Sequence, residues 1–242
     1  MNIRINEELV KNIGRIYKID RKTSLKLIKS KPSLVKKHIK NSKKIVQEME
    51  KLNNNNNYSW AKDMENRNKN RLDSVAIFYR GNQITYRQLF KQRDEFAKSF
   101  KSLGIQKGDE IPACISNIPE LVSMLMALNM IGAKPNIFGA DFSEDYIEEI
   151  INGCDKKIFI ASDDNYEKIE HIVAKTKVEK KLVFSLTDSL PNHKDPYAEY
   201  DEPFYHFENK VTNLIVRDSN VLSIEKFISL GKNYQGAVEE AV

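Results

Sequence analysis

Two cysteines and four histidines are the side chains in this sequence that could bind a transition metal. The cysteines are Cys114 and Cys154, and the histidines are His38, His171, His193 and His206. Zinc sites usually contain pairs of such ligands about two to five residues apart, and no pair here has that spacing. We therefore predict no metal site. We interpret both cysteines as buried free thiols of a protein in a reducing compartment.

One segment has the glycine spacing of a phosphate-binding loop. It is Gly231-Lys-Asn-Tyr-Gln-Gly236, but Ala237-Val238 follows it where such a loop has Lys-Ser or Lys-Thr. That lysine and hydroxyl are the groups that reach the β- and γ-phosphates and Mg²⁺. The sequence contains neither G-x-G-x-x-G nor G-x-S-x-G. We predict no nucleotide cradle in this chain.

Paired carboxylates occur at Asp163-Asp164 and at Glu148-Glu149. Adjacent residues of a helix point to different sides, so neither pair suits shared acid–base chemistry. We interpret both pairs as solvated faces. The sequence thus indicates no catalytic, cofactor-binding or metal-binding residue.

The elements that would position any such residue alternate between short strands and helices. Strands are predicted at 75–79, 83–85, 110–115, 134–138, 157–161 and 181–184, and helices at 86–103, 119–131, 144–152, 166–174 and 223–230. Thr85 and Ser143 are typical N-caps, and Gly104 and Gly132 are typical helix ends. This order predicts an α/β fold with a mostly parallel sheet and helices on both faces. Residues 186–220 are predicted to form an irregular surface.

Charge divides the chain into two predicted domains. Residues 1–51 hold 15 Lys and Arg against 5 Asp and Glu, a net charge of +10, so the remaining residues hold 24 against 29, a net charge of −5. Helical spacing of apolar residues predicts helices at 5–19 and 33–52, followed by five asparagines from Asn53 to Asn57. We predict a basic helical arm with an Asn-rich linker over 1–57, and an α/β body over 58–242.

Three roles are open for the basic arm. Its apolar stripe could pack on the α/β body of the same chain, or residues 1–51 could bind an anionic membrane surface. Nucleic-acid binding is disfavoured, because the body is acidic and Tyr17 is the arm's only aromatic residue. No apolar run reaches the roughly 18 residues of a membrane span, and the N-terminus lacks the apolar region of a signal peptide. We expect a cytoplasmic protein, membrane-peripheral if the arm binds lipid.

Three segments, in order, resemble one enzyme family. They are 73–79 with 84–90, 103–109 followed by 117–121, and 127–136. Residues 72–190 thereby resemble the N-terminal portion of AMP-forming acyl-CoA synthetases, the adenylate-forming ligases. Members of this family join an acid to ATP and pass the acyl group to CoA, so the resemblance implies ATP, Mg²⁺ and CoA as cofactors of a full-length parent.

In that family the phosphate loop would follow Val242, so the resemblance implies a chain truncated before its chemistry and inactive alone. The Lys-rich arm favours a fatty acid as the parent's substrate. The expected partners are the missing C-terminal remainder and a second copy of the chain, through uncovered apolar surface. The alternatives are a non-catalytic interaction module whose arm binds membrane or protein, and a nucleic-acid-binding α/β domain.

Overall fold

The computed structural model describes residues 22, 29, 59–154, 156–193 and 210–238. The chain forms two units, Met1–Tyr58 and Ser59–Val242, and every element described below belongs to the second unit. The helices predicted at 5–19 and 33–52 and the linker at 53–57 lie outside the described residues. Within the described residues, no helix has both the length and the apolar character required to cross a membrane.

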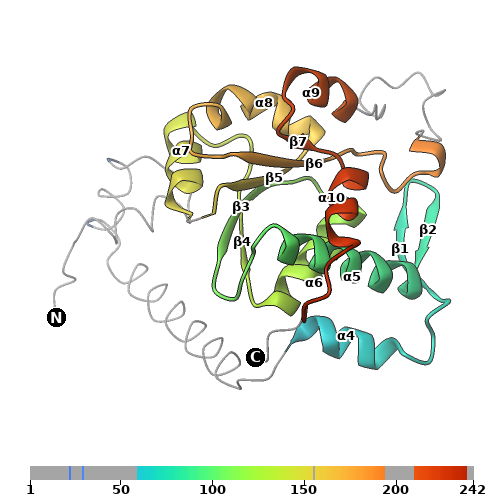
Figure 1. The fold of residues 1–242 in the computed structure, drawn as a ribbon. Coiled ribbons are helices and arrows are strands. Elements are labelled where there is room, and N and C mark those ends of the chain that lie inside the picture. The colour runs from blue at the N-terminus through green and yellow to red at the C-terminus, as the bar shows by residue number, and fades with distance from the viewer. Residues whose placement is uncertain (1–21, 23–28, 30–58, 155, 194–209, 239–242) are drawn as a thin grey trace. The chain divides into compact units, whose positions relative to one another are not determined.

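A five-stranded parallel sheet is the centre of this unit (Figure 1). Its strands are β3 (Glu110–Cys114), β4 (Lys134–Ile137), β5 (Ile158–Ser162), β6 (Lys180–Phe184) and β7 (Val221–Leu222), in the order β4-β3-β5-β6-β7. All four neighbouring pairs are parallel. The predicted α/β fold class is therefore confirmed.

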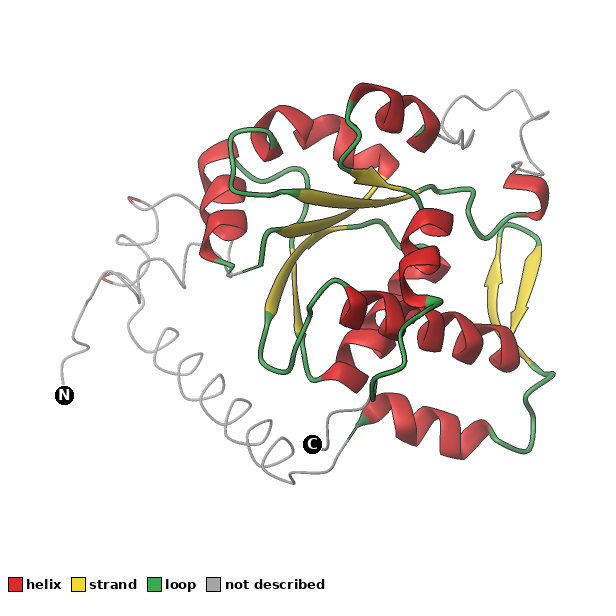
Figure 2. Ribbon diagram, in the orientation of Figure 1, coloured by secondary structure: helices red, strands yellow, loops and turns green. Residues whose placement is uncertain are grey.

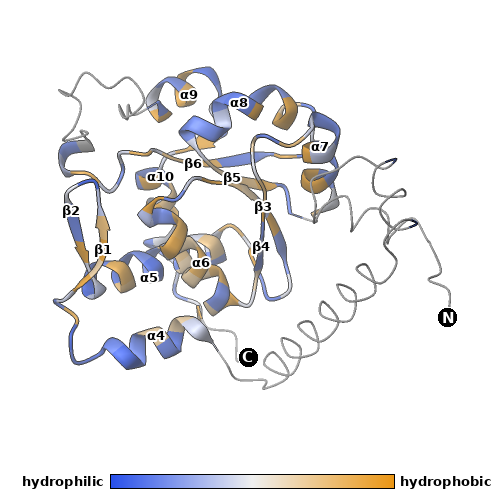
Figure 3. Ribbon diagram, turned by 180° about the vertical axis from the view of Figure 1, so that it is seen from behind, coloured by the Kyte–Doolittle hydropathy of each residue, from blue (hydrophilic) through white to orange (hydrophobic). Residues whose placement is uncertain are grey.

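Helices cover both faces of the sheet. One face carries α5 (Tyr86–Ser102), α6 (Pro119–Ile131) and α10 (Ile224–Gly231), and the other carries α7 (Glu144–Gly153), α8 (Asp163–Val173) and α9 (Val211–Arg217) (Figure 1). Strand residues alternate between the two cores, as the period of two requires. Ile158 and Ile160 of β5 join the first core, whereas Phe159 joins the second. Figure 3 shows the resulting hydrophobic colouring of β5 and α6.

Aromatic rings fill the first core where α5 and α10 cross. Phe96 stacks on Phe184 at a centroid distance of 5.4 Å, and Phe227 meets Phe96 edge-on at 5.4 Å. The two helices approach closely at Gly231, where an added Cβ would lie 2.6 Å from the Ser99 hydroxyl and 2.7 Å from the Ser99 nitrogen. Gly231 therefore ends a tightly packed helix, and a larger residue there would push α10 away from α5.

A separate antiparallel hairpin lies beside the sheet (Figure 2). It consists of β1 (Val75–Tyr79) and β2 (Asn82–Thr85), and it leads directly into α5. Thr85 forms a reciprocal capping box with Gln88 at the start of that helix, as its residue type predicted. The short α4 (Trp60–Asn68) packs against α6.

Several features of the structure differ from the sequence predictions. Helix α8 starts at Asp163 and not at 166, because two acidic residues suit its first turn. Residues 186–220 are not uniformly irregular: α9 forms there and buries Val211 and Leu214, and β7 begins just after them at Val221. Helix α4 was not predicted. Ser143 is the N-cap residue of α7, as predicted, although its side chain makes no capping hydrogen bond.

Candidate functional site

The strand order creates one topological switch point in the sheet. The chain leaves β3 through α6 on one face, whereas it leaves the neighbouring β5 through α8 on the opposite face. In open α/β sheets, ligands bind outside the carboxyl ends of the strands at such a point. We therefore examine the carboxyl edge, defined as residues 115–120, 162–165 and 185–190.

Side-chain hydrogen bonds join the ends of β3 and β5. The backbone N–H of Ser116 donates to the Ser162 hydroxyl at 3.0 Å, and the Ser116 hydroxyl donates to the Asp164 carboxylate at 2.9 Å. Asn165 donates its side-chain N–H to the same hydroxyl at 3.2 Å. The polar groups at the switch point therefore form hydrogen bonds with one another.

Asp163 is buried at the first position of α8, with 1% of its surface exposed. Its carboxylate accepts backbone N–H bonds from Asp164 at 3.0 Å, Leu186 at 3.2 Å and Lys210 at 3.2 Å. Burial raises the pKa of Asp163, and these hydrogen bonds oppose that rise. The prediction that Asp163 lies on a solvated face is therefore wrong: a residue directly after a buried strand is still inside the protein.

Glu120 is the most enclosed carboxyl group of this edge. It is the second residue of α6, and 1% of its surface is exposed. Oε1 accepts a hydrogen bond from the Ser189 hydroxyl at 2.5 Å, whereas Oε2 is buried with no hydrogen-bond partner among the described residues. Burial raises the pKa of Glu120 to about 7.

Asp188 lies in the post-β6 loop, residues 185–190, close to Glu120. Its carboxylate accepts the Ser185 backbone N–H at 2.8 Å. Burial raises the pKa of Asp188 to about 8, and the negative charges of Glu120, Glu225 and Asp163 add to the effect. The loop is thus surrounded by carboxyl groups from α6, α8 and α10.

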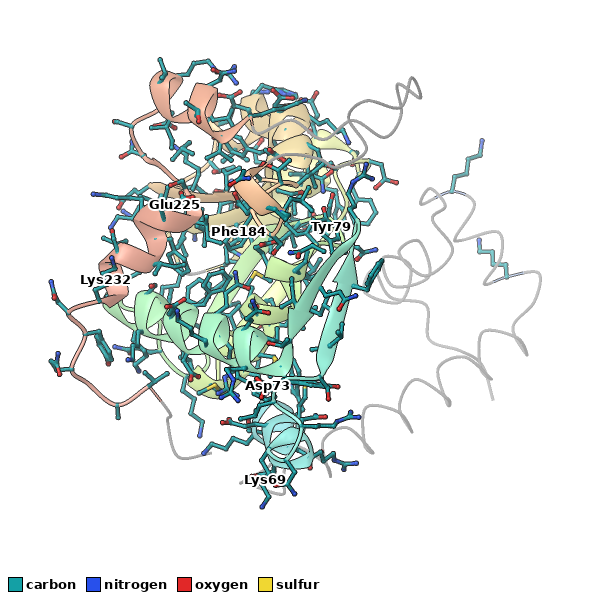
Figure 4. The ribbon with its side chains drawn as sticks, turned by 90° about the vertical axis from the view of Figure 1, so that its right-hand side faces the viewer. Lys69, Asp73, Tyr79, Phe184, Glu225 and Lys232 are labelled. Atoms are coloured by element: carbon teal, nitrogen blue, oxygen red, sulfur yellow. The ribbon has the colours of Figure 1, made fainter. Side chains whose placement is uncertain are left out.

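The hairpin holds the other side of the post-β6 loop. The Tyr79 hydroxyl donates to the Leu186 carbonyl at 2.8 Å, and the Asn82 amide donates to the Ser189 carbonyl at 2.5 Å. Figure 4 shows Tyr79 on the hairpin, and it labels Phe184, the last residue of β6, and Glu225 on α10. Segments about 107 residues apart in the sequence are therefore joined at this edge.

This chemistry suits holding a proton better than holding a phosphate. A phosphate needs backbone N–H groups and cations, and the positive end of a helix dipole is where it usually binds. Here Glu120 and Asp163 occupy the first turns of α6 and α8. The described residues also contain no group of three or more His, Cys, Asp or Glu side chains arranged to hold a metal ion.

The cysteines match their predicted state. Cys114 and Cys154 are both free and buried, and burial raises the pKa of the Cys114 thiol to about 12. A thiol with such a pKa is a poor nucleophile at neutral pH.

The sequence analysis missed the buried carboxyl cluster. Acidic residues that are adjacent in the sequence form an obvious pair. The cluster in the structure instead combines single acidic residues that follow different strands. Glu120 follows the predicted strand 110–115 after a short turn, and Asp163 follows the predicted strand 157–161 almost at once. Parallel strands bring their carboxyl ends to one edge, and that rule was the available signal.

Comparisons with known proteins agree with this fold. A family profile described as "AMP-binding enzyme" matches residues 64–218. An acetyl-coenzyme A synthetase from Syntrophus aciditrophicus is 32% identical over 100 residues, which are 39% of this chain and 16% of that protein. One from Novosphingobium aromaticivorans is 31% identical over 119 residues, which are 46% of this chain and 18% of that protein.

A solved structure shows the same fold. It is that of coronafacic acid ligase from Pectobacterium brasiliense, which matches with a TM-score of 0.55 and 18% sequence identity, over 76% of this chain and 31% of that chain. The chain spans about a sixth of the length of the curated relatives it matches.

Proposed function

This chain belongs to the family of AMP-binding enzymes, and on that premise we propose that it is the N-terminal scaffold of an AMP-forming acid–CoA ligase. The observation that carries the proposal is the family match over residues 64–218. These residues include the hairpin, α5 to α9 and four strands of the parallel sheet. In this role the chain forms one wall of a larger catalytic domain.

The division of labour follows from the charge of the carboxyl edge. Adenylation builds negative charge on phosphate oxygens, which must be stabilised by cations and N–H donors. Glu120, Asp163 and Asp188 are acidic and would repel phosphate oxygens, so the described residues of this edge do not fit a triphosphate. We propose that the groups that bind ATP, Mg²⁺ and CoA belong to a longer polypeptide that continues this wall.

The proposed substrate is a small carboxylic acid. The named relatives are acetyl-coenzyme A synthetases, and this favours acetate over a fatty acid. The expectation of a fatty acid rests on the Lys-rich arm, which lies almost wholly outside the described residues.

Acid-dependent ATP–pyrophosphate exchange tests the proposal. We would compare residues 1–242 with the polypeptide encoded when the reading frame continues beyond Val242, using acetate, palmitate and benzoate. We expect no exchange from residues 1–242 and exchange with acetate from the longer polypeptide. Exchange from residues 1–242 alone would contradict the scaffold role, and inactivity of the longer polypeptide with every acid would contradict the ligase.

The proposed partner is the rest of that catalytic domain. Large apolar side chains are exposed on the hairpin, on β4 and on α9: Val75, Phe78, Ile137, Ile215 and Val216. Phe78 is 67% exposed and Val216 is 82% exposed. We propose that the continuing polypeptide covers part of this surface and that isolated copies of residues 1–242 associate through it. Sedimentation that stays monomeric up to high concentration would contradict this association.

A further inference from the structure

We propose that Glu120 is a proton-dependent latch that fastens the post-β6 loop to the start of α6, and that the latch holds most firmly when Glu120 carries a proton. This proposal concerns the chain's own response to pH, and it does not depend on the ligase assignment.

The geometry provides a contact that depends on protonation. Ser189 donates to Oε1 of Glu120 at 2.5 Å, while Oε2 is enclosed with no hydrogen-bond partner among the described residues. A protonated carboxyl group can remain buried at moderate cost. An ionised one needs further donors, and in this closed arrangement the described residues offer the Ser189 hydroxyl and the backbone N–H of Glu120 itself, while Oε2 has none. Ionisation therefore favours loop positions in which water reaches Oε2.

The groups packed around the latch increase this preference. The loop itself contributes Asp188, α8 contributes Asp163, and α10 contributes Glu225. The hairpin contributes the hydroxyl of Tyr79, and Arg80 at the hairpin turn has interactions of its own. The charges that raise the pKa of Asp188 are thus carboxylates, and one of them is Glu120, so the ionised forms of Glu120 and Asp188 repel each other.

Hydrogen bonds to other elements of the described unit hold the loop at Leu186 and at Ser189. Asp163 and the hairpin fix Leu186, while Ser189 is held through Glu120 and Asn82. Inside the loop, Leu190 donates its backbone N–H to the Thr187 carbonyl at 2.9 Å, which makes the Leu190 amide a reporter of the closed loop.

Amide hydrogen exchange between pH 4.5 and 8.5 tests the latch. The raised pKa of Glu120, about 7, means that the closed loop binds the proton more tightly than an open loop, in which the ordinary value of about 4.5 applies. The protection factor of the Leu190 amide should fall roughly tenfold per pH unit between these values and then level off. The Lys134 amide, which donates to Asp109 at the other end of the sheet, is the internal reference.

Two variants test whether the pH dependence of the Leu190 protection factor comes from the Glu120 carboxyl group. Glu120→Gln keeps the shape without the charge, so it should clearly reduce the fall in the Leu190 protection factor between pH 4.5 and pH 7. The fall that remains in this variant belongs to Asp188, whose pKa burial also raises. Glu110→Gln is the matched control, because Glu110 is exposed at the start of β3 and should leave the wild-type profile unchanged.

Three results would overturn the latch. They are a flat profile in the wild type, a full pH response in Glu120→Gln, or a response abolished by Asp188→Asn alone. If Glu120→Gln fails to fold, the pH profile of the Leu190 protection factor in Ser189→Ala tests the latch instead. The Ser189 hydroxyl lowers the pKa of Glu120, so its removal should move the plateau to higher pH. An unchanged plateau in Ser189→Ala would also count against the latch.

Discussion

The two edges of the central sheet hold their acidic side chains with different kinds of partner. At the amino edge, meaning the residues that begin or just precede the strands, three acidic groups each face a lysine. Lys156 lies 3.1 Å from Asp109, Lys181 lies 2.8 Å from Asp218, and Lys157 pairs with Glu179. At the carboxyl edge, Glu120, Asp163 and Asp188 are enclosed and are held by hydroxyl and backbone donors.

The consequence is that the edges respond to pH in opposite directions. The hydrogen bond from Lys181 lowers the pKa of Asp218, so its stabilising effect is lost as the pH falls. Burial raises the pKa of Glu120 and of Asp188, so stability from these groups is lost as the pH rises. Solvated ion pairs cost little to fold, whereas the buried Glu120 and Asp163 and the partly buried Asp188 each lose hydration on folding.

The largest expected effect comes from neutralising two of the buried acids together. The ordinary values are 4.5 for Glu120 and 3.8 for Asp188, against about 7 and about 8 in the folded protein. Each unit corresponds to about 1.4 kcal/mol, and the two groups titrate as a coupled pair. The wild-type free energy of unfolding should therefore fall by several kcal/mol between pH 4 and pH 9, with about 9 kcal/mol as the upper limit set by these values.

In the double variant Glu120→Gln/Asp188→Asn this fall should be absent. Urea unfolding at pH 4, 6 and 8 measures it, and the double variant should be the more stable protein at pH 8. A double variant that loses stability at pH 8 would show that the ionised carboxylates, not their protonated forms, stabilise this edge.

The next effect is the loss of the Asp163 acceptor. In Asp163→Ala, the backbone N–H groups of Leu186 and Lys210 lose their shared partner. Buried donors left without acceptors cost about 1–3 kcal/mol each, so we expect a loss of about 3 kcal/mol at pH 6. Asp163→Asn keeps one acceptor oxygen and should lose less. Equal losses in the two variants would mean that charge, and not hydrogen bonding, is the role of this residue.

This contrast also explains what the sequence could predict. Strands and helices follow local patterns, so Thr85 correctly located the start of α5, and Pro119 and Gly132 correctly located the ends of α6. The ion pairs and the carboxyl cluster depend on which strands are neighbours. Glu120 and Ser189 are 69 residues apart, and no local pattern relates them. Asp163 was assigned to solvent for the same reason.

The irregular segment after β6 shows the same limit. Three prolines between 191 and 203 favoured a surface loop, but Val211 and Leu214 are buried against the face that α7 and α8 cover. Short elements such as β7, with two residues, gain their stability from β6 beside them and leave little trace in the sequence.

At the amino edge, the Lys181–Asp218 pair should give the strongest of several small effects. The Lys181 side chain is 11% exposed and that of Asp218 is 27% exposed. Lys181→Met should cost about 1 kcal/mol at pH 7, as expected for a partly solvated pair. Because the pKa of Asp218 is lowered, this difference should persist down to pH 4 and disappear only as the pH falls further. A double-mutant cycle with Asp218→Asn measures the coupling, and a coupling that grows on acidification would contradict the assignment.

The smallest effect belongs to the most exposed pair. The side chains of Lys157 and Glu179 are 57% and 64% exposed. Glu179→Gln should change the free energy of unfolding by less than about 0.5 kcal/mol, and 1 M salt should remove the difference. Glu110→Gln, which removes the same charge from an exposed position, is the matched control. A larger, salt-insensitive loss in Glu179→Gln would show that the amino edge also depends on its charges, and the contrast between the two edges would then fail.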